Sequence, residues 1–385
     1  YYFGDNKSDY VVAESKDLAL NEAIKKTKNS NLTLDDLVQE EDVLDTWFSS
    51  WLWPISVFDG IRNPNNEEIE YYYPTNDLVT GPDILFFWVA RMIIAGYEYK
   101  SELPFKNVYL TGLVRDKEGR KMSKSLGNGI DADSVLECGA GGRTGSWKVK
   151  GPEKTVSLKA NKIGSECFRL WKACEAQVGD DFHINPEEIE AKYFGVLTKL
   201  FNVARFASQF DMPDVEPTTP FPVEDRWIRS EFSTTMTVVE SSWNDLDIYT
   251  ATQALKTFGT GILPSHWLEM AKTRLYDGDM HAAWTIHSIL KDFLAAFSPV
   301  CPFFCHHISM TLYDESSVDV DQFPTQGPVD EQLNNLTPEV EAFNSEVWKT
   351  KKEQGLSLNA EIEGVLIPDS LEEFKGTLTR MHKLL

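Results

Sequence analysis

The residues best suited to chemistry lie in one segment, residues 119–128, with the sequence GRKMSKSLGN. Two lysines, Lys121 and Lys124, are separated by two residues and have a glycine on each side. Glycine gives the backbone unusual freedom, so a loop of this kind is able to move and close over a ligand. Two positioned ammonium groups suit a polyphosphate, because they oppose the negative charge of the phosphates. The plain alternative is a solvated surface turn.

A second candidate nucleotide site is the tripeptide Gly81-Pro82-Asp83, at the junction between a predicted strand and a predicted helix. Nucleotides bind at such junctions in α/β folds. Gly81 allows close approach to the backbone, and the Asp83 carboxylate is able to accept hydrogen bonds from ribose hydroxyls. The tripeptide alone is a weak signal, because an aspartate near a helix start is more often a cap. Gly112, at the end of the next predicted strand, is similarly placed for an adenine.

A small apolar pocket is predicted beside this junction. Ile84 and Trp88 are four residues apart, so they share one face of a helix. Trp47, in the motif DTWFSS at residues 45–50, supplies a further aromatic wall. Together these side chains are able to enclose a small apolar ligand. Ordinary core packing is the alternative.

These candidate residues fall on alternating predicted strands and helices. Short apolar runs at 71–80 and 107–114 flank an apolar helical stretch at 82–97. That order predicts two parallel strands joined by a crossover helix, hence an α/β fold. Ahead of them, residues 15–28 have the composition of a polar helix.

Beyond about residue 180 the pattern is almost entirely helical. Apolar residues recur at intervals of three and four, and the predicted helices are 187–210, 227–243, 251–276 and 281–297. They form a predicted all-helical bundle that ends near residue 315. The tail is mixed, with a connection rich in Pro, Gly and Asp at 319–330, a helix at 338–354, a strand at 362–367 and a helix after 369.

The composition restricts the partners of the chain. With 37 Lys and Arg against 60 Asp and Glu, the net charge is −23. This argues against a general nucleic-acid binder, because backbone contacts need clustered cations. No apolar run approaches the ~20 residues of a membrane span. Five scattered cysteines fit a reducing cytoplasm. Cys301 and Cys305, followed by two histidines, suggest a metal cluster, but the apolar helical pattern around them favours packing, and we predict no metal ligands.

Taken whole, the loop at 119–128 resembles the KMSKS signature of class I aminoacyl-tRNA synthetases. The resemblance implies that the loop stabilises the transition state in which an amino-acid carboxylate attacks the α-phosphate of ATP and pyrophosphate leaves. It implies that Lys124 is the main phosphate-contacting residue and Lys121 its support, with Mg²⁺ accompanying ATP. The ATP-binding residues that it implies are Gly81, Asp83, Gly112, Lys121, Met122, Ser123, Lys124 and Ser125.

Within this family, DTWFSS followed by GPDILFFWVARM at residues 81–92 is similar to the valine-specific enzymes. The similarity implies that Trp47, Ile84 and Trp88 form a valine pocket. The implied activity is ATP-dependent attachment of valine to tRNA(Val) through a valyl-adenylate, by a cytoplasmic enzyme that we expect to be a monomer. An isoleucyl- or leucyl-tRNA synthetase is the alternative, because one methylene is worth only ~1–3 kcal/mol in an apolar pocket. A non-catalytic tRNA-binding or nucleotide-binding remnant is the alternative outside the enzymes.

The resemblance predicts an α/β domain, a partial Rossmann-type fold, followed by an all-α bundle. Its parts are 1–44, a remnant of the connective or editing insertion; 45–137, the second half of the catalytic Rossmann domain; 138–180, an insertion and stem region; 181–317, the helical anticodon-binding domain; and 318–385, a C-terminal extension. The HIGH half of the nucleotide fold is missing from the sequence, so we expect a C-terminal piece that is inactive alone.

A second departure from the family is the stretch 138–163, which interrupts the pattern. Residues alternate around Gly151-Pro152, which predicts a β-hairpin. Its lysines are among the few concentrated positive charges of the chain, so contact with tRNA phosphates is predicted for Lys148, Lys150 and Lys154. A solvated insertion without a partner is the alternative.

Overall fold

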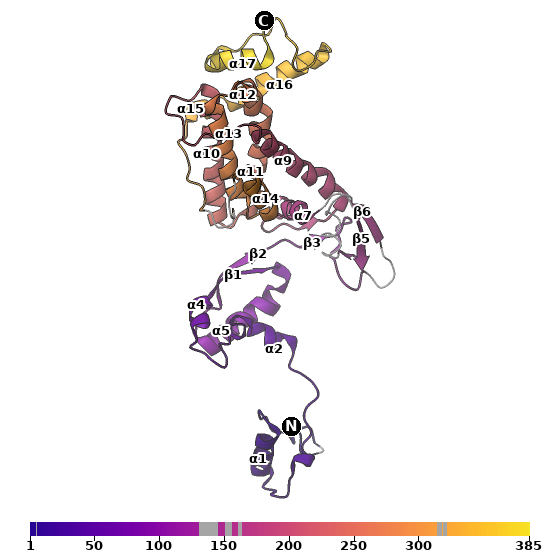
Figure 1. Cartoon of the computed structure of the whole chain (residues 1–385). Coiled ribbons are helices and arrows are strands. Elements are labelled where there is room, and N and C mark those ends of the chain that lie inside the picture. The colour runs from indigo at the N-terminus through magenta and orange to yellow at the C-terminus, as the bar shows by residue number, and fades with distance from the viewer. Residues whose placement is uncertain (5, 131–144, 151–155, 161–163, 314–317, 319–321) are drawn as a thin grey trace. The chain divides into compact units, whose positions relative to one another are not determined.

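The computed structural model describes residues 1–385 except 5, 131–144, 151–155, 161–163, 314–317 and 319–321 (Figure 1). The chain forms two compact units, Tyr1–Leu110 and Thr111–Leu385, which are described separately. Within the described residues, no helix combines the length and the apolar character needed to cross a membrane.

The first unit begins with helix α1, Lys16–Thr27. Ser15 caps its start, because the Ser15 hydroxyl accepts a hydrogen bond from the Leu18 N–H at 3.3 Å. Ala19 and Ala23 are fully buried against Val11 and Leu37 in a small separate core. The predicted helix at 15–28 is therefore confirmed.

The rest of the first unit contains the predicted strand–helix–strand unit. Strands β1, Thr75–Thr80, and β2, Phe105–Leu110, are parallel, with Thr75 opposite Phe105 and Thr80 opposite Leu110. Three short helices precede β1: α2, Thr46–Trp51; α3, Trp53–Ser56; and α4, Glu67–Tyr72. The strand therefore begins four residues later than predicted, since α4 occupies part of the expected range.

The connection between the two strands differs from the single helix predicted at 82–97. It begins with a 3-10 turn, Pro82–Ile84, continues as a π-helical segment, Leu85–Val89, and becomes α-helical only in α5, Ala90–Lys100. Pro82 has no N–H to donate and favours a tight first turn. Ile84, with φ −111° and ψ 12°, departs from α-helical geometry at the junction.

The second unit begins with short strands. Strand β3, Val114–Arg115, pairs in parallel with β7, Phe182–His183. The strands β4, Gly129–Ile130; β5, Gly145–Lys150; and β6, Val156–Ala160, form an antiparallel sheet in which β5 pairs with both neighbours. The predicted hairpin is confirmed at the level of its two strands. The predicted strand 107–114 is divided between β2 and β3.

Helices make up most of the second unit (Figure 1). They are α7, Ser165–Glu175; α8, Pro186–Ile189; a π-helical turn, Glu190–Phe194; α9, Gly195–Ala207; α10, Val223–Asn244; α11, Ile248–Thr257; a π-helical segment, Phe258–Trp267; α12, Leu268–Tyr276; α13, Met280–Phe297; and α14, Pro302–Tyr313. The predicted bundle is confirmed. The π-helical segment interrupts the helix predicted at 251–276, because Pro264 cannot donate the regular backbone hydrogen bond.

The tail adds α15, Glu331–Asn334; α16, Thr337–Glu353; a 3-10 segment, Asp369–Phe374; and α17, Lys375–His382. The predicted helices at 338–354 and after 369 are confirmed. The predicted strand at 362–367 is wrong, since this stretch has only an isolated bridge from Ile362 to Leu384. Gly364 has a φ of +77°, and Leu366 is 89% exposed, so the segment has neither extended geometry nor one buried face.

A buried ionic network joins α10 and α12. Arg274 donates to Glu224 Oε1 at 3.0 Å and to Asp225 Oδ2 at 2.6 Å, and both carboxylates are almost fully buried. Trp267 Nε1 also donates to Asp225, at 3.0 Å. Burial raises the pKa of Asp225, and the hydrogen bonds from Arg274 oppose that rise. Arg274 is the buried cation that compensates both carboxylates, and Glu224 also lies 3.7 Å from the more exposed Arg380.

We predict that Arg274→Gln lowers the free energy of unfolding of the helical region by roughly 3–5 kcal/mol, because it leaves the buried Asp225 carboxylate without its cation. Urea unfolding followed by tryptophan fluorescence measures this change. Lys272→Gln is the matched control: it removes a cation from the same helix, but one in a half-exposed pair with Glu269 at 3.1 Å. Its cost should stay below ~1 kcal/mol. Equal losses in both variants would contradict the role given to Arg274.

Candidate functional site

The lysine loop, residues 119–128, emerges from β3 through a tight turn. The Asp116 N–H donates to the Arg120 carbonyl at 3.0 Å, and the Gly119 N–H donates to the Asp116 carbonyl at 2.9 Å. Arg115 and Lys121 form an antiparallel bridge across this turn. Gly119 has a φ of +80°, and a side chain there would be strained. This glycine therefore shapes the turn, whatever it contributes to motion.

The Asp116 side chain organises the turn from a position that is only 7% exposed. Its Oδ1 accepts from the Glu118 N–H at 3.1 Å and from the Arg120 N–H at 2.8 Å. Its Oδ2 accepts from Arg120 Nε at 2.8 Å and from Asn128 Nδ2 at 2.9 Å. Burial alone would raise the pKa of Asp116, but the hydrogen bonds from Asn128 and Arg120 outweigh burial and lower it to about 2. These ionic contacts are therefore complete above about pH 4 and are lost only as the pH falls towards 2.

The far end of the loop is held by Asn128. Its Oδ1 accepts from the Ser123 N–H at 2.9 Å, and its Nδ2 also donates to the Lys121 carbonyl at 3.3 Å. The Ser123 hydroxyl accepts from the Leu126 N–H at 3.2 Å and lies 3.1 Å from the Ser125 hydroxyl. The loop thus has a defined internal structure of its own.

The side chains of the KMSKS residues fall into two groups. Lys121, Lys124 and Ser125 are exposed, which makes them accessible to a ligand. Met122 is partly buried and packs against the hydrophobic core of the second unit. The sequence did not distinguish these two kinds of residue, and the structure favours an anchoring role for Met122.

Residues of β7 and the residue before it contact the base of the loop. Asp181 accepts from Arg115 Nε at 2.6 Å and from the Leu113 N–H at 2.9 Å. His183 lies under Gly119, where a Cβ would come within 3.3 Å of its Nε2. A Cβ on Gly112 would overlap the Asp180 carbonyl oxygen. Within the second unit, the requirement for glycine at 112 is therefore explained by backbone packing, and its predicted contact with adenine stays a prediction.

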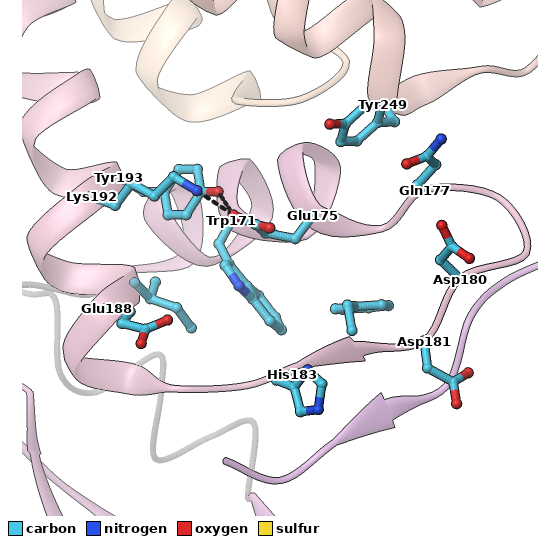
Figure 2. A pocket seen from close by; sticks show the side chains of 12 residues that line it. Trp171, Glu175, Gln177, Asp180, Asp181, His183, Glu188, Lys192, Tyr193 and Tyr249 are labelled. Atoms are coloured by element: carbon cyan, nitrogen blue, oxygen red, sulfur yellow. Dashed lines mark hydrogen bonds and ion pairs between the residues drawn. The ribbon is translucent and has the colours of Figure 1, made fainter. Parts of the chain in front are cut away.

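A cavity of about 440 Å³ lies beside β7 (Figure 2). Trp171 and Phe182 line it together with four acidic side chains: Glu175, Asp180, Asp181 and Glu188. Figure 2 shows Glu175 on α7 meeting Lys192, at 2.6 Å, and the Tyr193 hydroxyl. These contacts lower the pKa of Glu175, against the effect of burial. No feature of the sequence indicated this cavity, since its walls come from separate elements.

The first unit contains the other predicted nucleotide-binding residues. Gly81 caps the 3-10 turn with an ordinary φ of −78°, and Asp83 lies exposed within that turn. Gly81, and not Asp83, is therefore the N-cap residue of this turn. Its predicted contact with a ribose is untested by the geometry.

An apolar pocket of about 310 Å³ opens beside this turn. Ile84 and Trp88 both line it, as predicted, together with Trp53, Leu78 and Met92 among others. Ile84 is 37% exposed, so it is not an ordinary core residue. Trp53, Leu78 and Met92 were missed by the sequence analysis, since no motif singles them out.

Trp47 packs against Trp88, which lines this pocket. Its ring centroid is 6.3 Å from that of Trp88, in an edge-to-face arrangement, and Arg91 Cζ lies 3.4 Å from the ring centroid of Trp47. Trp47 does not line the pocket itself. The structure therefore corrects the expected wall: Trp47 buttresses Trp88, and Trp53 stands among the lining residues.

The remaining candidates are less completely described. Lys148 and Lys150 lie on β5, where only the backbone is described, and Lys154 falls outside the described residues. Cys301 and Cys305 are fully buried in the bundle core, and burial raises the pKa of the Cys301 thiol. Over the described ranges, no group of three or more His, Cys, Asp and Glu side chains could hold a metal ion.

Two family models match the chain. Residues 2–185 match the class I tRNA synthetases for I, L, M and V, and residues 225–366 match the anticodon-binding domain of tRNA ligases. A solved structure with a similar fold is the ternary complex of Agrobacterium radiobacter K84 LeuRS with tRNA and LeuAMS. It has a TM-score of 0.56 and 17% identity, and the match covers 77% of this chain and 34% of that one.

Curated relatives align along the whole chain. It is 34% identical to a valine–tRNA ligase of Christiangramia forsetii over 100% of this chain and 42% of the relative. It is 40% identical to that of Phocaeicola vulgatus over 79% of this chain and 32% of the relative. It is 58% identical to that of Bacteroides fragilis over 43% of this chain and 19% of the relative. The chain thus spans less than half the length of these relatives.

The KMSKS loop on β3, the helical bundle that follows it, and the matches to both parts agree, and the chain belongs to the class I aminoacyl-tRNA synthetase family.

Proposed function

We propose that the full-length protein containing this chain attaches valine to tRNA(Val), with ATP as the second substrate and valyl-adenylate as the intermediate. The observation that carries the proposal is the lysine loop: a structured turn on β3 presents Lys121 and Lys124 on its exposed side. The relatives that cover the whole chain are valine–tRNA ligases, which favours valine over isoleucine or leucine.

The chemical role of the loop follows from its charges. When pyrophosphate leaves the α-phosphate of ATP, negative charge accumulates on the departing oxygens. Ammonium groups held in place by a structured loop oppose that charge without rearranging at the moment of reaction. We assign the main contact to Lys124 and the supporting contact to Lys121, with Mg²⁺ bound to the phosphates of ATP. Gly81, Asp83 and Gly112 are assigned to the adenosine moiety.

The decisive test is valine-dependent ATP–pyrophosphate exchange by the full-length protein. Isoleucine and threonine serve as competing amino acids, because each differs from valine by one small group. Exchange that requires valine supports the proposal. Exchange driven best by isoleucine or leucine, or no exchange with any amino acid, would refute it.

The lysine assignment predicts a kinetic effect. In the full-length enzyme, Lys124→Ala should slow adenylation about a hundredfold, which corresponds to ~3 kcal/mol for one positioned charge, with little change in valine affinity. The control is Lys117→Ala, which removes an exposed lysine of the same turn outside the motif, 3.9 Å from Glu118. A change confined to the Michaelis constant for valine would show that the role is misassigned.

The pocket predicts an effect on selectivity. Ile84→Ala enlarges the apolar pocket, so discrimination against isoleucine should weaken. The expected loss is about tenfold to hundredfold, which is the discrimination that one methylene provides in an apolar pocket. Leu85→Ala is the matched control, because Leu85 is also 37% exposed but does not line the pocket. Relative kcat/KM values for valine and isoleucine report the outcome. If selectivity is unchanged and stability falls, then Ile84 contributes to packing and not to amino-acid selectivity.

The hairpin predicts a salt effect. Replacing Lys148, Lys150 and Lys154 by serine should weaken tRNA binding and reduce its salt dependence, while valine activation is preserved. Binding titrations at several salt concentrations measure both quantities. The same affinity for tRNA at every salt concentration would leave the hairpin without this role.

A further inference from the structure

We propose that Asp116 and Asn128 act together as a clamp that sets the position of Lys124, and are thus positioning residues for the loop's action on phosphates. The inference rests on the proposed function. It concerns residues on either side of the two lysines, one of them three residues before the GRKMSKSLGN segment. It assigns them a role through the loop backbone and no direct contact with substrate.

The first argument is connectivity. Asn128 uses both ends of its amide: Oδ1 accepts from the Ser123 N–H at 2.9 Å, and Nδ2 donates to Asp116 at 2.9 Å and to the Lys121 carbonyl at 3.3 Å. Only this orientation of the amide sets a donor against each acceptor. One side chain therefore ties the turn at 116 to the backbone immediately before and after Met122.

The second argument is charge and burial. The Asp116 carboxylate is 7% exposed and accepts four hydrogen bonds from Glu118, Arg120 and Asn128. Hydrogen bonds to a charged group are stronger and better oriented than neutral ones. By contrast, Glu118 reaches Arg120 only at 3.3 Å and is half-exposed. The clamp is thus the rigid part of the turn, and Glu118 is peripheral to it.

The third argument is the direction of the lysines. Lys121 and Lys124 are exposed, whereas Met122 between them packs into the core. Asn128 holds the backbone at 121 and 123 on both sides of this anchor. A backbone fixed at these points limits where Lys124 Nζ is able to reach. Pre-organisation of this kind counts in the transition state, because a loosely held cation must be ordered at the moment of reaction.

The inference is tested by a double-mutant cycle in the full-length protein, with the rate of valine-dependent ATP–pyrophosphate exchange as the measured quantity. Asn128→Ala removes every clamp contact of that side chain. Asn128→Asp keeps the size of the side chain and the oxygen that accepts from the Ser123 N–H. It places a second carboxylate against that of Asp116, so the two groups repel each other. Each should slow exchange about tenfold or more, with an unchanged Michaelis constant for valine.

The cycle separates positioning from simple stability. If Asn128 acts through Lys124, then Asn128→Ala combined with Lys124→Ala should be no slower than Lys124→Ala alone. Multiplying effects, as expected for independent damage, would overturn the inference. Glu118→Gln is the control within the same turn and should keep a near-normal rate. A loss in Glu118→Gln as large as in Asn128→Asp would also overturn it.

A structural readout keeps the inference independent of the proposed function. Trypsin cleaves after Arg120, Lys121 and Lys124, so its rate of cleavage reports the order of the loop. Cleavage there should be at least several-fold faster in Asn128→Ala than in the unmodified protein or in Glu118→Gln, at unchanged thermal stability. Equal cleavage rates would refute the clamp. If the unmodified protein shows no valine-dependent exchange, the proposed function fails while this measurement still decides the clamp.

Discussion

Two residue pairs of parallel β structure hold the lysine loop to the helical body. Val114 lies opposite Phe182 and Arg115 opposite His183, and the pairing closes more than sixty residues of intervening chain. Phe182 carries this pairing into the core, since its ring centroid is 5.4 Å from that of Trp171 on α7. Arg115 and Asp181 reinforce it at the surface. The geometry of the loop depends on these contacts, because the turn at Asp116 starts where β3 ends.

The molecule uses buried carboxylates in two different ways. In the bundle, Glu224 and Asp225 are compensated mainly by Arg274 and join helices that are far apart in sequence. In the turn, Asp116 is satisfied mainly by local N–H groups and one amide, all within twelve residues. The first arrangement fixes the packing of elements, and the second fixes the path of a single loop. The internal shape of the turn thus comes from local contacts, whereas the pairing of β3 with β7 sets where the turn attaches to the helical body.

Helix and strand types were predictable where apolar periodicity was strong. The parallel pair at residues 75–80 and 105–110 and the helices of the bundle follow directly from that pattern. Boundaries were missed where one residue type overrides periodicity, as at Pro82 and Pro264. The strand expected at 362–367 failed because Gly364 turns the chain with a positive φ and leaves Leu366 exposed. Ile84 and Trp88 were predictable from spacing, but the contact of Trp47 with Trp88 depends on a tertiary neighbour that sequence spacing does not specify. The contacts of Asp116 are local, but they depend on the path of the turn, which no motif indicates.

The close packing at Gly112 restricts which mutations of its codon the protein is able to tolerate. Its Cα faces the Asp180 carbonyl so closely that any Cβ would overlap the oxygen, and both partners are backbone, so neither is able to turn aside. Every missense change reachable from a glycine codon by one nucleotide introduces a Cβ. This position should therefore accept synonymous changes only, and lineages that keep this fold should retain glycine there whether or not the residue ever touches a nucleotide.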